Sequence, residues 1–179
     1  MHQDHEPKII LTRPEPGLTK FLGQLAQEIP SANVYCEALQ VIDFIPYQGD
    51  LTRYSGFVFT SSNGVRAAKR WNLPSRLGFG VGKVTTELAR SYCDPVYDGG
   101  SDVEALIALI ESMMPDGPLL HIRGRVSIGN LATRLSEYGI ETHEAVGYEQ
   151  NVCAPSDALI QLLQGGKPMI LPLFSPKSA

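Results

Sequence analysis

Short apolar runs alternate with amphipathic stretches along the chain. The runs are rich in β-branched and aromatic residues, which favours strands, whereas the stretches between them repeat apolar residues three or four positions apart, which favours helices. The predicted strands are Lys8–Thr12, Gly56–Thr60, Gly78–Val81, Pro95–Tyr97, Pro118–Ile122 and Pro168–Phe174. The predicted helices are Leu18–Glu28, Asn63–Trp71, Val84–Ser91, Asp102–Met114, Ile128–Tyr138 and Asp157–Gln164, with Ser101 or Asp102 and Ser156 as caps.

Strands that alternate with helices in this way predict parallel sheets with crossover helices. In such sheets ligands bind beyond the carboxyl ends of the strands. The turns that lead from a strand into a helix are therefore the places where we expect function.

Two long extended stretches, Asn33–Pro46 and Glu141–Gln150, interrupt the alternation and bracket a block of complete strand–helix units. An inserted domain that the chain enters and leaves through two paired strands explains both stretches. We predict an α/β protein with two small parallel-sheet domains, flavodoxin- or Rossmann-like, joined by a two-stranded ladder. The predicted bounds are 1–34 with 152–179 for the first domain, 47–142 for the second, and 35–46 and 143–151 for the linker strands.

A weak internal repeat links two segments of the chain. Phe57–Val65 and Leu171–Ala179 are both an apolar strand that ends in Phe and continues into a hydroxyl-bearing turn. A helix follows the first copy, whereas the second copy reaches Ala179 without one. We therefore expect the first domain to be incomplete, with one face of its sheet uncovered.

Composition and charge narrow the classes of function. The 179 residues are 43% hydrophobic and carry a formal net charge of −4, so the broad positive field typical of nucleic-acid binding is missing. The sequence has no apolar run of about 20 residues that could span a membrane, and its N-terminus lacks the apolar core of a signal peptide. We expect a cytoplasmic protein. Cys36, Cys93 and Cys153 are far apart, which argues against a disulfide framework or a zinc site.

Two strand-to-helix turns could hold an anion. The turn Thr60–Gly64 places hydroxyl groups and backbone N–H groups at the start of a helix, where an anion binds well; simple capping by Ser61 or Ser62 explains the same residues equally well. The turn that contains Gly82 and Thr85 has neither the spacing of a dinucleotide-binding fingerprint nor that of a P-loop.

Four further side chains could take part in chemistry. Arg123 and Arg125 end a strand, where one of them could hold a substrate carboxylate, or each could form a surface ion pair. His121 lies in an apolar strand and is better explained as a hydrogen-bonded structural histidine than as a general base. Tyr148 either packs in its strand or donates a proton or hydrogen bond to a leaving group.

Taken in order, these segments resemble the uroporphyrinogen-III synthase family. The motifs that carry the resemblance are Ile10–Pro14, Phe59–Val65, Val81–Thr85, Arg123–Gly124, Val146–Glu149 and Phe174–Ala179. The resemblance implies two α/β domains with the active site in the cleft between them, no cofactor or metal, and a monomer whose partner is a small-molecule substrate, with no role for nucleic acid or membrane. It also implies the reaction, in which hydroxymethylbilane loses its terminal hydroxyl group and closes with inversion of its last pyrrole ring, through a spiro intermediate, to give uroporphyrinogen III for haem synthesis.

The resemblance also assigns roles to single residues. Tyr148 matches the tyrosine that assists departure of the hydroxyl group. The substrate-binding positions that it implies are Arg13, Thr60, Ser61, Ser62, Asn63, Gly82, Thr85, Arg123 and Ser175. Members of the family continue beyond the final serine turn with another strand and turn, so we expect little activity from a chain of this length. The alternatives are an inactive, truncated paralogue and a non-catalytic two-domain module that binds a small ligand.

Overall fold

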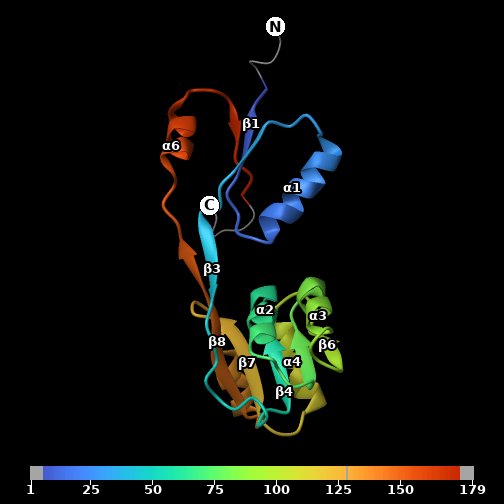
Figure 1. Cartoon of the computed structure of the whole chain (residues 1–179). Helices are drawn as coiled ribbons and strands as arrows, with labels where there is room; N and C mark the ends of the chain where they lie inside the picture. Colours follow the sequence, from blue (N-terminus) through green and yellow to red (C-terminus); the bar gives the residue numbers. More distant parts are fainter. Residues whose placement is uncertain (1–5, 128, 174–179) are drawn as a thin grey trace. The chain divides into compact units, whose positions relative to one another are not determined.

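The computed structural model describes residues 6–127 and 129–173 (Figure 1). The chain divides into two compact units, residues 1–42 with 150–179 and residues 43–149. Each unit is built on strands paired in parallel with helices against them, which confirms the predicted α/β class with parallel sheets. Within the described residues, no helix is both long enough and apolar enough to cross a membrane.

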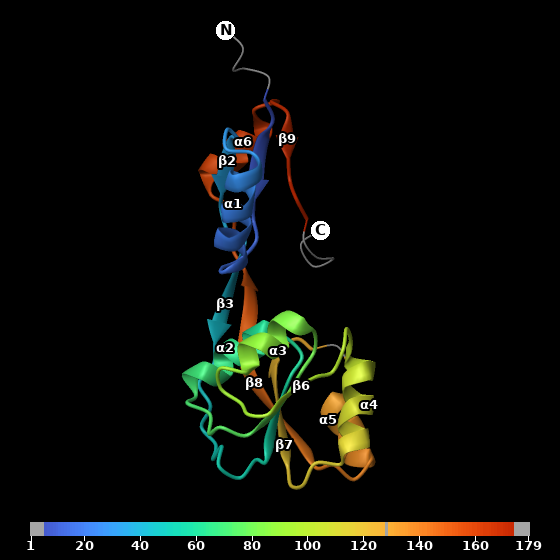
Figure 2. The ribbon, with the colours of Figure 1, turned by 90° about the vertical axis from the view of Figure 1, so that its right-hand side faces the viewer.

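The first unit contains a three-stranded sheet in the order β2-β1-β9. Both neighbours of the central strand run parallel to it, and the three strands are β1 (Lys8–Leu11), β2 (Val34–Cys36) and β9 (Met169–Ile170). Helices α1 (Gly17–Glu28) and α6 (Asp157–Gln164) flank this sheet on opposite sides, as Figures 1 and 2 show. The Ser156 hydroxyl oxygen accepts a hydrogen bond from the Leu159 N–H, which confirms the predicted cap of α6.

A six-stranded sheet has the order β3-β8-β7-β4-β5-β6. Four of its five pairings are parallel, and the strands involved are β4 (Gly56–Phe59), β5 (Leu77–Gly80), β6 (Val96–Asp98), β7 (Leu119–Gly124) and β8 (Thr142–Val152). Strand β3 (Gln40–Phe44) lies beside β8. The flanking backbone hydrogen bonds, from Ile45 N to Gly147 O and from Cys153 N to Leu39 O, run in opposite chain directions, as an antiparallel pair requires.

Helices cover both faces of the sheet in the second unit (Figure 2). On one face, α2 (Ser62–Arg70) and α3 (Lys83–Ala89) pack over Phe57 and Phe59. On the other face, α4 (Val103–Met113) and α5 (Leu131–Glu137) pack over Val58. Phe57 and Phe59 face one pair of helices and Val58 the other because successive side chains of a strand point to opposite faces of the sheet. The same rule determines the face to which each residue at the end of β4 points.

Three elements differ from the predictions. The stretch Asn33–Pro46 is not one extended segment but forms β2 and β3, which belong to different sheets. Helix α5 begins at Leu131 rather than at residue 128, because Gly129 has a φ of +93° and Asn130 is the cap. The strand expected over Pro168–Phe174 is limited to Met169–Ile170, since Pro172 has no N–H to donate to a ladder. The predicted turn at 174–179 lies outside the described residues.

Candidate active site

The predicted turns of the second unit meet at one edge of its sheet. Strands β5 and β7 both pair in parallel with β4, so their carboxyl ends lie side by side. Thr60 to Asn63 follow β4, Gly82 and Thr85 follow β5, and Arg123 is the second-last residue of β7. The topology therefore brings the hydroxyl-rich turns together, as ligand binding at the carboxyl ends of parallel strands requires.

Ser61 contacts both a helix and the candidate catalytic tyrosine. It is the cap of α2, where its hydroxyl oxygen accepts a hydrogen bond from the Gly64 N–H at 3.2 Å. The same oxygen lies 2.9 Å from the Tyr148 hydroxyl oxygen. Ser61 is thus the helix cap that the sequence offered as one alternative, while its binding of an anion stays a prediction.

The orientation of Tyr148 depends on a β-bulge in β8. Arg123 pairs with Val146, but the next residue, Gly124, pairs with Tyr148, so Gly147 is an extra residue without a partner on β7. Because side chains alternate between faces, the extra residue turns Tyr148 from the face of α4 and α5 to the face of α2. There its hydroxyl reaches Ser61.

Two glycines leave room for this bulge. A Cβ atom added to Gly147 would lie 2.7 Å from the Ala67 Cβ and 2.9 Å from the Ile122 Cγ2. A Cβ atom added to Gly124 would lie 2.9 Å from the Tyr148 Cζ, so the tyrosine ring covers this glycine closely. A side chain at Gly147 would thus collide with the core, whereas a side chain at Gly124 would displace the tyrosine ring.

Hydroxyl groups also join the turns after β4 and β5. The Ser62 and Thr85 hydroxyl oxygens are 3.4 Å apart, although Thr85 is almost fully buried. Gly82 caps α3 with a φ of +77°, a conformation that L side chains rarely adopt, and its N–H donates to the Gly100 carbonyl at 2.7 Å. Asn63 uses its side-chain oxygen to accept a hydrogen bond from Arg66 at 2.9 Å.

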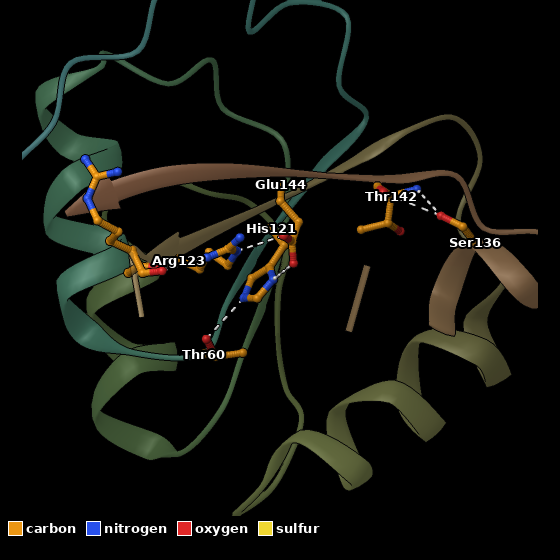
Figure 3. Close-up of polar contacts among 8 residues, drawn as sticks. Thr60, His121, Arg123, Ser136, Thr142 and Glu144 are labelled. Atoms are coloured by element: carbon orange, nitrogen blue, oxygen red, sulfur yellow. Dashed lines mark hydrogen bonds and ion pairs between the residues drawn. The ribbon is translucent and has the colours of Figure 1, made fainter. Parts of the chain in front are cut away.

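His121 connects the start of the β4 turn to β8 (Figure 3). It is 2% exposed, and its Nε2 lies 3.1 Å from the Thr60 hydroxyl oxygen, which confirms the prediction of a hydrogen-bonded, buried histidine. Its Nδ1 lies 3.6 Å from Glu144 Oε1 and finds no hydrogen-bond partner among the described residues. Burial lowers the pKa of His121 to about 4, against the opposing effect of the Glu144 carboxylate, so the imidazole is neutral near pH 7.

Both arginines at the end of β7 form ion pairs with β8. Arg123 Nε donates to Glu144 Oε2 at 2.8 Å, and its NH1 group donates to the carbonyl oxygens of Gly124 and Arg125. Arg125 Nε donates to Glu149 at 2.5 Å. These contacts favour the ion-pair alternative over direct binding of a substrate carboxylate, which stays a prediction for Arg123.

Two predicted residues remain, Arg13 and Ser175. Arg13 belongs to the first unit, where its guanidinium group lies against Gly17; a Cβ atom added to that glycine would lie 2.6 Å from Arg13 Nε. Ser175 lies outside the described residues. Across residues 6–127 and 129–173, no group of three or more His, Cys, Asp or Glu side chains could hold a metal ion.

Sequence reasoning did not single out Glu144. It lies opposite His121 only because Leu119 pairs with Thr142, and a single sequence does not reveal this register. The available signal is that side chains alternate between the two faces of each strand. If β7 and β8 are known to be neighbours and their register is known, this alternation places the Glu144 carboxylate and the His121 imidazole on the same face.

A parallel sheet with polar turns at the carboxyl ends of its strands is typical of α/β enzymes. The family model described as uroporphyrinogen-III synthase HemD matches residues 28–179, and the chain therefore belongs to the uroporphyrinogen-III synthase family, whose members are lyases.

Two solved structures share the fold. The chain is similar to the uroporphyrinogen-III synthetase of Helicobacter pylori 26695, with 17% identity and a TM-score of 0.60 over 97% of this chain and 75% of that one. It is also similar to a mutant uroporphyrinogen III synthase of the extremely thermophilic bacterium Thermus thermophilus, with 14% identity and a TM-score of 0.57 over 92% and 72% of the two chains. At these identities the similarity concerns the fold. No curated protein sequence matches the chain.

Proposed function

We propose that this protein is a uroporphyrinogen-III synthase, which converts hydroxymethylbilane into uroporphyrinogen III in the pathway to haem. The observation that carries the proposal is the family match over residues 28–179. It favours the synthase over the two alternatives that the sequence left open, an inactive paralogue and a ligand-binding module.

Tyr148 is the proposed catalytic residue. The Ser61 oxygen already accepts a hydrogen bond from the Gly64 N–H. Ser61 can then direct its own hydrogen to the Tyr148 oxygen, 2.9 Å away. In that arrangement the Tyr148 O–H is available to hydrogen-bond the departing hydroxyl group of the substrate. Loss of this group leaves a cation that closes the ring with inversion through a spiro intermediate.

The turns supply the proposed contacts to the substrate carboxylates. Ser62 and Thr85 present neighbouring hydroxyl groups, and the turns after β4 and β5 lead directly into helix starts. Local donors of this kind suit a protein with a net charge of −4 that must nevertheless hold a polyanion. The reaction then depends on positioning and on stabilisation of developing charge rather than on strong acids or bases.

We further propose that the two compact units are the two domains of the family fold, with β3 and β8 as the linker between them. Support comes from the position of the unit boundaries, at residues 42–43 and 149–150, which fall inside these two strands. The acidic net charge supports action on a small molecule without nucleic acid. The same proposal places the protein in the cytoplasm as a monomer.

A product assay tests the proposal. Purified protein incubated with hydroxymethylbilane is expected to form the type III isomer, slowly for a chain of this length, whereas the unaided reaction gives type I. The Tyr148→Phe variant is expected to turn over at least about tenfold more slowly, because the proton-donating group is gone while the ring still packs. Thermal unfolding checks that this variant remains folded.

Two outcomes would contradict the proposal at different levels. Type I product alone, formed at the rate of a blank without protein, would reject the synthase function. Type III product formed by Tyr148→Phe at the wild-type rate would leave the function in place and return Tyr148 to a packing role.

A further inference from the structure

We propose that His121 and Glu144 position the Thr60 hydroxyl group so that its oxygen accepts a hydrogen bond from a pyrrole N–H of the substrate. The identity of the substrate rests on the proposed function. The positions of the three side chains do not. Figure 3 shows these side chains joined in a row from Glu144 through His121 to Thr60.

The row has a geometric cause in the sheet. His121 on β7 pairs with Val58 of β4 on one side and with Glu144 of β8 on the other, so the imidazole lies between these two neighbouring strands. Thr60 is two residues beyond Val58 and therefore points to the same face as Val58 and His121. Its oxygen is the group that the imidazole Nε2 meets, at 3.1 Å.

The carboxylate selects the tautomer of the imidazole. A neutral histidine carries one N–H, and an ionised carboxylate can only accept a hydrogen bond. Glu144 Oε1 lies 3.6 Å from Nδ1, which is buried and has no other partner among the described residues. The proton is therefore most stable on Nδ1, and Nε2 is left as an acceptor.

Arg123 holds the carboxylate in this place. Its Nε donates to Glu144 Oε2 at 2.8 Å, so one carboxylate oxygen is fixed by the arginine while the other faces the imidazole. Only 33% of the Glu144 side chain is exposed, and 22% of the Arg123 side chain. An ion pair that is partly shielded from water keeps its geometry better than a fully exposed one.

The consequence falls on Thr60. Its one hydroxyl hydrogen is donated to Nε2, so towards a ligand the oxygen presents only lone pairs. Such an oxygen repels a carboxylate but accepts from an N–H group, and the pyrrole rings of the substrate are N–H donors. Ser62 and Thr85 bond to each other rather than to an acceptor-only group. One of the two hydroxyl groups donates to the other, so the hydrogen of the accepting group remains available to a ligand.

The tautomer can be measured without substrate or activity. Nitrogen-15 NMR of labelled protein distinguishes a protonated ring nitrogen from an unprotonated one. At pH 7 His121 is expected to be protonated at Nδ1 and unprotonated at Nε2. Glu144→Gln is expected to weaken this preference, whereas Glu141→Gln is the matched control, since Glu141 lies 2.8 Å from the more exposed His143. Protonation of His121 at Nε2 in the wild-type protein would overturn the proposal.

Kinetics test the role of the Thr60 oxygen. Thr60→Val and His121→Phe are each expected to raise KM for hydroxymethylbilane by about tenfold, the value of one hydrogen bond. The double variant should be no worse than either single one. Thr60→Ser and His121→Gln keep an oxygen acceptor at each position and are expected to restore most of the affinity.

An unchanged KM in Thr60→Val would overturn the proposal, as would additive losses in the double variant. If His121→Phe does not fold, the proposal is still tested by two measurements. These are the KM of Thr60→Val compared with that of Thr60→Ser, and the tautomer of His121 in the NMR spectrum. Failure of the wild-type protein to form the type III isomer would reject the proposed function instead. The tautomer of His121 would still show whether Glu144 holds the proton on Nδ1 and leaves Nε2 to accept from Thr60.

Discussion

His121 is a neutral imidazole enclosed between two strands, and its burial links folding to pH. In the folded chain its pKa is about 4, whereas an unfolded histidine has a pKa near 6.5. Above pH 6.5 both states are neutral at this residue. As pH falls below 6.5, the unfolded chain binds a proton that the folded chain does not bind, so stability decreases until pH reaches about 4.

This difference gives a prediction for His121→Gln. The free energy of unfolding of the wild-type protein should fall by up to about 3 kcal/mol more than that of the variant between pH 6.5 and pH 4. Urea unfolding at a series of pH values measures both curves, and their difference removes the effect of the carboxylates that both proteins share. Parallel curves would show that His121 takes up its proton equally well in the folded chain.

The candidate site could be predicted in part at this scale. Thr60 and Ser61 were singled out from the sequence because a strand that ends in hydroxyl residues before a helix is a local pattern, and Tyr148 was assigned its role through the family resemblance. Their partners were not predicted, because the contacts of Ser61 with Tyr148 and of Thr60 with His121 join residues far apart in the chain. Such contacts depend on strand order and register, which local patterns do not contain.

The bulge in β8 is the element-scale feature on which the site depends. It reverses the face of every residue that follows Gly147, so it decides whether Tyr148 or its neighbour faces α2. Gly124 lies directly beneath the tyrosine ring, so an added Cβ atom would fit only if the ring moved.

Gly124→Ala is expected to reduce turnover about as much as Tyr148→Phe, because the added methyl group displaces the ring from Ser61. The stability cost should be about 1–2 kcal/mol, since the ring can move towards solvent. The product assay and urea unfolding measure the two effects. Gly23→Ala is the control: an added Cβ meets nothing within 4 Å in α1, so activity should be unchanged and stability slightly higher. Full activity in Gly124→Ala would show that the ring position is not critical.

Elements were predictable where local signals agree. Helix α6 has the predicted bounds because Ser156 caps its start. Gly139 ends the region of α5 as expected: with a φ of +85°, it allows the Ile140 N–H to reach the Leu135 carbonyl. The division of Asn33–Pro46 between two sheets could not be predicted, because both halves are extended and only tertiary pairing separates them.

At the scale of the whole molecule, the buried core is divided unequally. Within the described residues, the fully buried apolar side chains of the first unit are Ile10, Leu11 and Leu159. The second unit contains two extensive apolar clusters, one on each face of its sheet. Since apolar burial is the main stabilising contribution, the second unit should be the more stable one.

Hydrogen exchange under native conditions checks this expectation. Amide groups in β4 and β7 should exchange only through openings of high free energy, while those in β1 and β2 should exchange at lower denaturant concentration. Both sets of amide groups are measured in one sample, so the opening free energies of the two units are compared under identical conditions. A single opening free energy for all four strands would show that the chain unfolds as one cooperative body.

The family could be recognised from the sequence because several weak motifs occur in a fixed order over most of the chain, and the family match confirms that recognition. The two long extended stretches are likewise visible without any structure, and they are the reason for the proposed division into two domains. The proposed domain bounds differ from the compact units by several residues, because continuous strands cross each boundary and no local signal marks the position.

Ser61 has a consequence for how this protein can change under selection. One oxygen atom both completes the first turn of α2 and orients the candidate catalytic tyrosine. A substitution there is exposed to selection for folding and for turnover at once. Threonine satisfies both demands, whereas aspartate can cap the helix but places a negative charge beside the tyrosine. We therefore expect this position to tolerate very little drift, even among relatives whose other turns have diverged.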